Sequence, residues 1–251
     1  MSLSPVRRLR GLIFDLDGLF ADTEPIQKRA FEQLCQRYLG PQFRLTDALH
    51  AEMVGRSDAE NARMLVERFG IPQAPERLVE ERIGLYVELL KREPVLPCEG
   101  VFALLEAGRA RGMRLGIASS SVQEFVTLTL CRVFETVGYP DPPEAVFSAV
   151  VCGDDPRIRA RKPAPDIYQR CVADLGLRPE ECLALEDSGS GVLSARRAGI
   201  PIVIAVPNRY TKTHDFDDAT AVLSTVKDAL VFLPEADQDS VSGGEGASER
   251  S

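Results

Sequence analysis

The stretch that decides the fold is Leu12-Ile13-Phe14-Asp15-Leu16-Asp17-Gly18, an apolar run that ends in two carboxylates and a glycine. An uninterrupted apolar run bounded by turn residues is typical of a strand covered on both faces, so residues 12–14 predict a short buried strand. Asp15 then follows the strand's carboxyl end, where open α/β sheets bind their ligands. Two buried acids need a cation or a proton to offset their desolvation, so Asp15 and Asp17 indicate a metal site. A metal beside a carboxylate favours phosphate chemistry.

Two other interpretations of this acidic pair remain open from the residues alone. An Asp-x-Asp pair is often a solvated turn. Asp-x-Asp-Gly also occurs in EF-hand calcium loops, but those loops lie between two helices and end in a Glu ligand, whereas here a strand precedes the pair. The neighbouring Asp22 and Thr23 are interpreted as caps of a helix that begins near Glu24, with Pro25 in its first turn.

Three further segments place polar side chains at comparable points. A strand-like run over 113–118 ends in serines from Ser119 onwards, and a later apolar run ends in Glu186 and Asp187 before a glycine-rich turn. Lys162 stands directly before a Pro-started helix, where the helix dipole disfavours a cation, so its position favours a functional role over a solvated side chain. Acid, hydroxyl, lysine and acid together form a set that no single member would imply.

In this order the four segments resemble the motifs of the haloacid dehalogenase superfamily. The resemblance is closest to its subfamily I branch of sugar phosphatases, β-phosphoglucomutase-like and pseudouridine-5′-phosphatase-like proteins, and it covers about residues 9–233. It implies an α/β fold with a Rossmann-like parallel sheet, helices on both faces and an inserted all-helical cap. The implied activity is Mg²⁺-dependent hydrolysis of a small phosphorylated metabolite, a sugar or nucleoside monophosphate, through an aspartyl-phosphate.

The resemblance also implies a role for each motif residue. Those implied to be catalytic are Asp15, Asp17, Ser119 and Lys162; those implied to bind metal are Asp15, Asp17, Glu186 and Asp187. Asp15 would be the nucleophile, and Asp17 would exchange protons and lend the metal its backbone carbonyl. Glu186 would reach the metal directly or through water; its alternative, with Asp187, is a cap of the next helix. Ser120 and Arg56 would bind substrate.

Departures from the family pattern bear on the reaction. Mutases of this branch have a histidine where this chain has Gln27 and an arginine where it has Asp58, so hydrolysis is favoured over a phosphomutase reaction. Arg161 stands where glycine is common in relatives, which leaves two alternatives open: a slightly different backbone, or an Arg161 side chain that reaches the mouth of the site. The second alternative is a catalytically silent binding protein on the same fold, which would have little need for Asp17.

The order of predicted elements indicates how the chain is divided. Helices over 24–39, 58–69 and 75–92 follow the first strand without any strand between them. Helices and strands then alternate, which implies a parallel sheet. The helices are expected at 101–111, 122–131, 164–175, 190–198 and 225–232, and the strands at 113–118, 146–151, 182–186 and 200–205, with a short run at 219–223. We therefore predict a core of residues 1–23 and 95–234, a cap of 24–94 and a disordered tail of 235–251.

Composition narrows the class of protein. The 251-residue chain carries a net charge of −8 and no basic run, which disfavours a nucleic-acid partner, and its apolar runs are far shorter than the roughly 20 residues needed to span a bilayer. Neither a secretory signal nor a zinc site is expected. Six cysteines without a CxxC pair indicate small core residues in a reducing compartment, hence a cytoplasmic protein, expected to be a monomer. His50 and His214 are interpreted as surface or loop residues.

Overall fold

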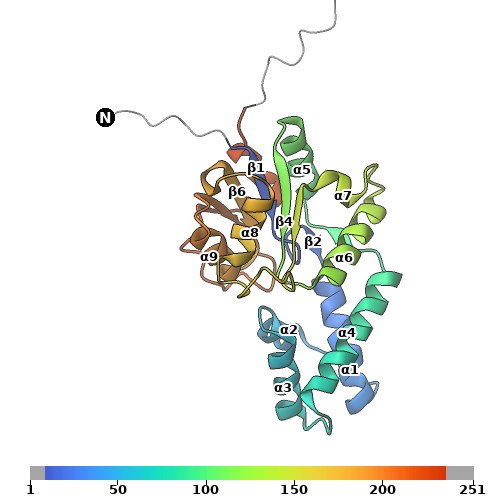
Figure 1. Ribbon diagram of the computed structural model, residues 1–251. Coiled ribbons are helices and arrows are strands. Elements are labelled where there is room, and N and C mark those ends of the chain that lie inside the picture. Colours follow the sequence, from blue (N-terminus) through green and yellow to red (C-terminus); the bar gives the residue numbers. More distant parts are fainter. Residues whose placement is uncertain (1–8, 236–251) are drawn as a thin grey trace, which may run out of the picture.

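The computed structural model describes residues 9–235 and contains a six-stranded parallel sheet with helices on both faces and a separate group of helices below it (Figure 1). The strand order is β5-β4-β1-β6-β7-β8. The strands are β1 Gly11–Phe14, β4 Arg114–Ala118, β5 Ala149–Val151, β6 Cys182–Glu186, β7 Ile202–Ala205 and β8 Ala221–Val222. This confirms the predicted fold class. The predicted disordered tail lies outside the described residues except for Glu235.

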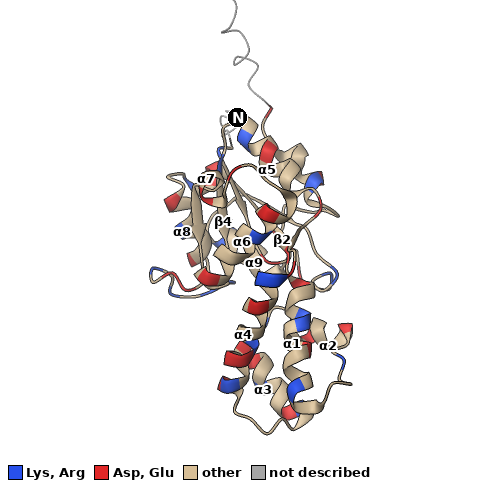
Figure 2. Ribbon diagram, turned by 90° about the vertical axis from the view of Figure 1, so that its right-hand side faces the viewer, with Lys and Arg blue, Asp and Glu red and all other residues tan. Residues whose placement is uncertain are grey.

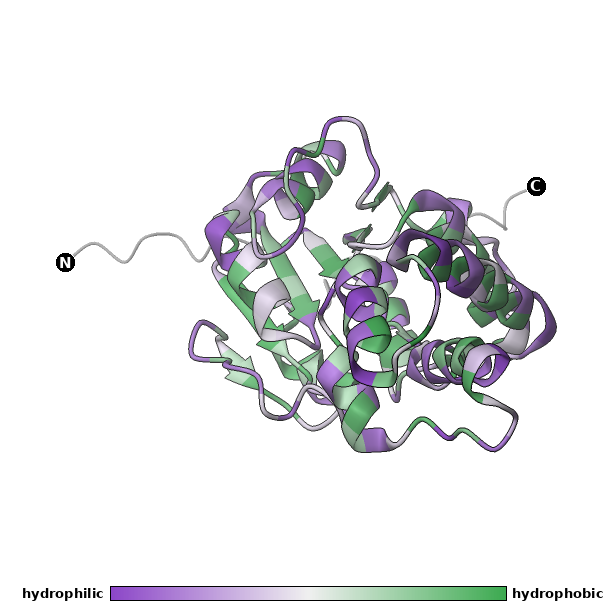
Figure 3. Ribbon diagram, turned by 90° about the horizontal axis from the view of Figure 1, so that it is seen from below, coloured by the Kyte–Doolittle hydropathy of each residue, from purple (hydrophilic) through white to green (hydrophobic). Residues whose placement is uncertain are grey.

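The central strand is apolar on both sides because both of its faces are covered. Leu12 and Phe14 belong to one core cluster, which includes residues of α5 (Val101–Ala110), α6 (Gln123–Val137) and the 3₁₀ helix η2 (Val226–Phe232). Ile13 belongs to the other, with residues of α8 (Asp166–Asp174) and α9 (Gly189–Arg197). Alternate residues of a strand point to opposite faces, so β1 contributes to two cores at once. Figure 3 shows the strands as hydrophobic segments inside a more hydrophilic surround.

Strand register brings the motif residues to one edge of the sheet. Phe14 of β1 pairs with Ile117 of β4 on one side and with Leu185 of β6 on the other. The residues that follow these partners therefore leave the sheet together at its carboxyl edge.

In the chain, a helical cap is inserted between the first strand and the remaining strands of the sheet. Its helices are α1 Glu24–Leu39, α2 Asp47–Met53, α3 Asp58–Phe69 and α4 Pro75–Arg92, and α4 packs against both α1 and α3. Charged side chains are spread along α1 and α4 (Figure 2), and the buried residues of these helices are mostly apolar. A two-stranded antiparallel ribbon of β2 (Ala21–Asp22) and β3 (Leu96–Pro97) joins cap and core. The limits 1–23, 24–94 and 95–234 stay a prediction.

Several element boundaries differ from the sequence prediction. The sequence predicts no helix over 47–53, but α2 forms there with Thr46 as its N-cap, whose side chain accepts a hydrogen bond from the Leu49 amide. A seven-residue helix is too short to show a helical period. The predicted strand 146–151 is instead the end of α7 (Pro143–Val146) followed by β5, and α6 continues six residues past the predicted end at 131, to the left-handed Gly138.

The described cysteines are free thiols, and four of them are buried: Cys35, Cys152, Cys171 and Cys182. Burial of these four agrees with the core role that the sequence indicates. No helix within residues 9–235 is long and apolar enough to cross a membrane.

Candidate active site

Three buried carboxylates meet at the carboxyl edge of the sheet. Asp15 follows β1, Glu186 ends β6 and Asp187 follows it, and each offers an oxygen that lies within 4.8 Å of the others. None of the three residues is more than 7% exposed. Such a cluster needs positive charge nearby, and carboxylate oxygens are the donors that Mg²⁺ and Ca²⁺ prefer, so the donor set fits a hard divalent cation.

Lys162 supplies part of that positive charge. Its Nζ donates to Asp15 Oδ1 at 2.6 Å, to Glu186 Oε1 at 2.6 Å and to the Ala118 carbonyl at 2.8 Å. These three bonds use all three ammonium hydrogens. Although burial opposes its charge, Asp15 and Glu186 raise the pKa of Lys162, so it stays protonated. One ammonium group does not balance three carboxylates, so a divalent ion could offset the remaining negative charge. Because the Lys162 side chain is buried, the alternative of a solvated lysine is wrong.

Desolvation dominates the electrostatics of the acids. Burial raises the pKa of Asp15 to about 8, with Lys162 opposing the shift and Glu186 adding to it. Burial also raises the pKa of Asp187 well above its usual value, with further contributions from Asp15 and Glu186. In the absence of a cation, burial and mutual repulsion therefore favour the protonated forms of these carboxyls, and a bound divalent ion would oppose that protonation.

Asp17 has a different environment from the clustered acids. Its Oδ1 accepts from the Thr23 hydroxyl at 2.9 Å and its Oδ2 from the Ser121 hydroxyl at 2.7 Å. Burial raises the pKa of Asp17, and these two hydrogen bonds partly lower it. Thr23 occupies the N-cap position of α1, as the sequence predicts, but its hydroxyl makes no cap bond and donates to Asp17 instead. Asp22 is an exposed residue of β2 and lies outside the N-cap position.

The serines after β4 divide between two positions. Ser119 is 1% exposed, and its Oγ accepts from the Ser121 amide at 3.0 Å. Ser120 and Ser121 line the cavity in front of the acids. Ser188, and neither Glu186 nor Asp187, caps α9, so the capping alternative for that acidic pair is wrong.

Three residues that the sequence analysis missed hold the acids in place. Asn208 Nδ2 donates to Asp187 Oδ2 at 2.7 Å, and the Tyr168 hydroxyl donates to Glu186 Oε1 at 2.7 Å; Thr23 is the third. Asn208 lies just beyond β7, a fourth parallel strand end, which is the signal that could have found it. Gly18, at φ 86°, leaves them space: a Cβ there would lie 2.5 Å from Asp187 Oδ2.

A cavity of about 420 Å³ opens in front of these groups. From the core it is lined by residues that include Asp15, Asp17, Ser120, Arg161, Lys162, Asp187 and His214, and from the cap by Glu24, Gln27, Val54, Gly55, Arg56, Ser57 and Glu60. Arg56 and Arg161 both line this cavity, and their roles stay a prediction. The sequence analysis places His50 on the surface or in a loop, and this is wrong. His50 belongs to α2 and is 2% exposed, and its Nε2 bonds to Glu24 Oε2 at 2.8 Å.

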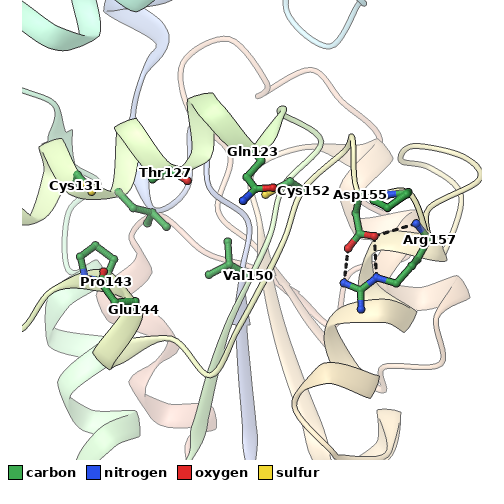
Figure 4. Close-up of a pocket in the computed structure, with 11 residues that line it drawn as sticks. Gln123, Thr127, Cys131, Pro143, Glu144, Val150, Cys152, Asp155 and Arg157 are labelled. Carbon is green, nitrogen blue, oxygen red and sulfur yellow. Dashed lines mark hydrogen bonds and ion pairs between the residues drawn. The ribbon is translucent and has the colours of Figure 1, made fainter.

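Another cavity, of about 500 Å³, lies beside edge strand β5 (Figure 4). Val150 faces it from β5 and Gln123 and Thr127 from α6, while Asp155 and Arg157 form an ion pair at one side. None of the clustered carboxylates lines it. The cavity at the carboxyl edge is therefore the candidate active site.

Comparisons with known proteins agree with this geometry. The model of the haloacid dehalogenase-like hydrolase family matches residues 12–205. The chain is 32% identical to Protein CbbY of Rhodobacter capsulatus, over 84% of this chain and 91% of that protein. It is 31% identical to the phosphorylated carbohydrates phosphatase of Thermotoga maritima, over 89% and 94%. The crystal structure of a putative beta-phosphoglucomutase from Thermotoga maritima superposes with a TM-score of 0.71 at 25% identity, covering 89% of this chain and 98% of that one. The chain belongs to the haloacid dehalogenase-like hydrolase family.

Proposed function

We propose that the protein is a Mg²⁺-dependent phosphatase that hydrolyses a small phosphorylated metabolite, a sugar or nucleoside monophosphate, through an aspartyl-phosphate. That the chain is a phosphoric monoester hydrolase rests on its family and on relatives named as phosphatases. The observation that carries the mechanism is that Asp15 and Asp17 have different hydrogen-bond partners. Asp15 is bound to Lys162 beside two more carboxylates, whereas Asp17 is held by hydroxyls.

The clustered acids would hold the metal. Asp15 and Asp187 are the proposed direct ligands. Glu186 already accepts from Lys162, Tyr168 and Ser188, so we assign it a supporting place through water. A bound Mg²⁺ would offset the charge of the phosphate oxygens.

The chain's own residues perform the bond changes. Lys162 holds Asp15 Oδ1, which leaves Oδ2 to form a bond with phosphorus while the bond to the leaving oxygen breaks. Asp17 gives its proton to that oxygen, and its raised pKa keeps the proton available. Asp17 then takes a proton from water as the water oxygen attacks phosphorus, which releases inorganic phosphate and restores Asp15.

Two cap residues favour hydrolysis over the phosphomutase alternative. Arg82 donates to Gln27 Oε1 and, at 3.2 Å, to Asp58 Oδ2, so both positions that differ from mutases are engaged with one arginine. Neither supplies the histidine or the arginine of that reaction. A silent binding protein is disfavoured because binding alone has little need for Asp17, whose carboxylate is held by hydroxyls and whose pKa is raised by burial.

Hydrolysis of p-nitrophenyl phosphate tests the proposal. We expect turnover with Mg²⁺, loss of turnover after EDTA treatment, and inhibition by Ca²⁺, which prefers more ligands at longer distances and loosens the in-line geometry. Full activity in metal-free buffer would contradict the mechanism. No turnover of any phosphate monoester with Mg²⁺ would favour the binding protein.

A further inference from the structure

A smaller cavity of about 120 Å³ lies among the cap helices and adjoins the candidate active site. The residues that line both cavities are Glu24, Gln27, Val54, Gly55 and Arg56. Because the two spaces share these walls, a phosphate ester bound at Asp15 would direct its leaving group towards the smaller cavity, which we call the cap subsite.

Three buried polar side chains line the cap subsite, and each has an atom without a hydrogen-bond partner among the described residues. They are His50 (Nδ1), Asn61 (Oδ1) and Arg82 (Nε), which are 2%, 3% and 6% exposed. A buried polar atom without a partner is costly, so a cluster of three around one cavity indicates that a ligand satisfies them.

The remaining bonds of these residues fix what each free atom can do. His50 Nε2 faces the Glu24 carboxylate, which only accepts, so Nε2 carries hydrogen and Nδ1 is left for a ligand. Asn61 Nδ2 donates to the Met53 carbonyl at 3.1 Å, which leaves Oδ1 as an acceptor. Arg82 Nε is a donor, since a guanidinium has no acceptor. An acceptor on Asn61 and a donor on Arg82 in one cavity match hydroxyl groups, which both donate and accept.

Charge and size narrow the ligand further. Asp58 pairs with Arg82. The cap subsite is lined by two arginines, Arg56 and Arg82, and by two acidic residues, Glu24 and Asp58, so positive and negative charges are equal in number. An additional phosphate or carboxylate, which only accepts, would face the free acceptor of Asn61. The cap subsite, at about 120 Å³, has less than a third of the volume of the active-site cavity, about 420 Å³, which favours a short chain over a nucleoside.

We propose that the cap subsite binds the uncharged, hydroxylated part of the substrate, a polyol or sugar chain of few carbons, through His50, Asn61 and Arg82. The proposal rests on the proposed function of the neighbouring site and selects among its substrates. A phosphate monoester of a small polyol fits, whereas a nucleotide or an ester with a second anionic group does not.

Three phosphate esters of similar size test the proposal on the wild-type enzyme. Glycerol 1-phosphate carries two hydroxyls, n-propyl phosphate carries none, and 3-phosphoglycerate carries a carboxylate in place of one. We expect kcat/KM for glycerol 1-phosphate to exceed that for each of the others by about tenfold or more, because the analogues leave buried groups unpaired. Equal values, or a preference for 3-phosphoglycerate, would overturn the proposal. An ordered water filling the subsite in every complex would also give equal values.

The variant Asn61→Leu removes one acceptor at similar side-chain size. We expect it to lower the ratio of kcat/KM for glycerol 1-phosphate to that for n-propyl phosphate by about three- to tenfold. Glu67→Leu on the exposed side of the same helix is the matched control and should leave the ratio unchanged. The wild-type comparison needs no variant, so unfolding of Asn61→Leu would not protect the proposal. Hydrolysis of p-nitrophenyl phosphate without hydroxyl selectivity would refute the cap subsite alone, whereas no hydrolysis of any ester would refute the phosphatase.

Discussion

At the scale of single residues, the acids of the site are distinguished by their neighbours. Asp15 bonds to an ammonium group, Asp187 to an amide, and Asp17 to the hydroxyls of Thr23 and Ser121, with the Ser119 hydroxyl farther away at 3.5 Å. The same side-chain type could therefore serve as a nucleophile, a metal ligand and a proton donor at one sheet edge. The neighbours of each aspartate determine its protonation and which of its oxygens remains available.

Replacing Asp15 by Asn should abolish turnover, because an amide is not a nucleophile towards phosphorus and is a weaker metal ligand. Stability without metal should hold or rise, since one carboxylate is removed from a buried cluster of three. Single-turnover assays and thermal melts in EDTA measure both effects. Substantial remaining activity would contradict the assignment of Asp15.

Replacing Thr23 by Val should lower kcat and move the alkaline limb of its pH profile upwards. The Thr23 hydroxyl hydrogen-bonds to Asp17 and lowers its pKa against the larger effect of burial, so its loss raises that pKa and delays loss of the acid proton. The control is Thr46→Val, whose hydroxyl caps α2. An unchanged profile for Thr23→Val would show that the contact does not set the proton affinity of Asp17.

The sequence predicts the principal site residues because each follows a parallel strand or carries a charge that its position makes costly. Asp15, Lys162 and Asp187 converge as the motif order implies. Thr23 and Asn208 could not be assigned in this way, since their roles depend on side-chain contacts between segments distant in sequence or turn geometry, which periodicity does not encode.

At the scale of elements, the loop after β7 connects the carboxylate cluster with the cap. Asn208 donates to Asp187, and two residues later the Tyr210 ring packs edge-on against His50 of α2, with centroids 4.7 Å apart. One short loop thus contacts both halves of the candidate site.

Replacing Asn208 by Ala should weaken metal binding by about 10- to 100-fold, the range typical of groups that orient a ligand. The Mg²⁺ concentration for half-maximal activity should rise accordingly, with little change in melting temperature in EDTA. Asp187 would lose the donor that holds Oδ2. An unchanged Mg²⁺ requirement would mean that Asp187 is oriented by other contacts.

Element prediction succeeds where burial is strong and fails where elements are short. The apolar strands β1, β4, β6 and β7 and the long cap helices are apparent in the sequence. Each shows either an apolar run or apolar residues at helical spacing over several residues. The two-residue strands β2 and β3 are defined by backbone pairing rather than by any side-chain pattern, whereas β8 falls within the short run predicted at 219–223.

At the scale of the whole molecule, the buried acids should make metal-free stability depend on pH. The pKa of Asp15 rises from 3.8 to about 8 on folding, so between those values the folded state binds more protons than the unfolded state. Stability in EDTA should therefore fall as pH rises from about 4 to about 8. Melting temperatures across that range should fall less steeply for Asp15→Asn. Mg²⁺ should stabilise more at the alkaline end; the opposite trend would contradict these protonation states.

The cap should determine substrate choice. Arg56 lines both cavities from the loop between α2 and α3, so Arg56→Ala should lower kcat/KM for the physiological substrate by of order 1.5–3 kcal/mol through loss of a charge-assisted contact. The loss should be much smaller for p-nitrophenyl phosphate, which offers the cap little to bind. Equal losses on both substrates would mean that Arg56 supports the fold or the catalytic centre, and no loss on either would make it a solvated surface residue.

The antiparallel ribbon of β2 and β3 has a consequence for how this molecule can be altered. The chain leaves the sheet domain at Asp22 and returns at Leu96, and these two residues pair directly. An insert whose ends are adjacent spans no gap, so its length and shape are free to vary without displacing the strands on either side. An exchange of the helical insert would therefore act on the cap residues that line the cavity, while the strands that carry the clustered acids keep their pairing.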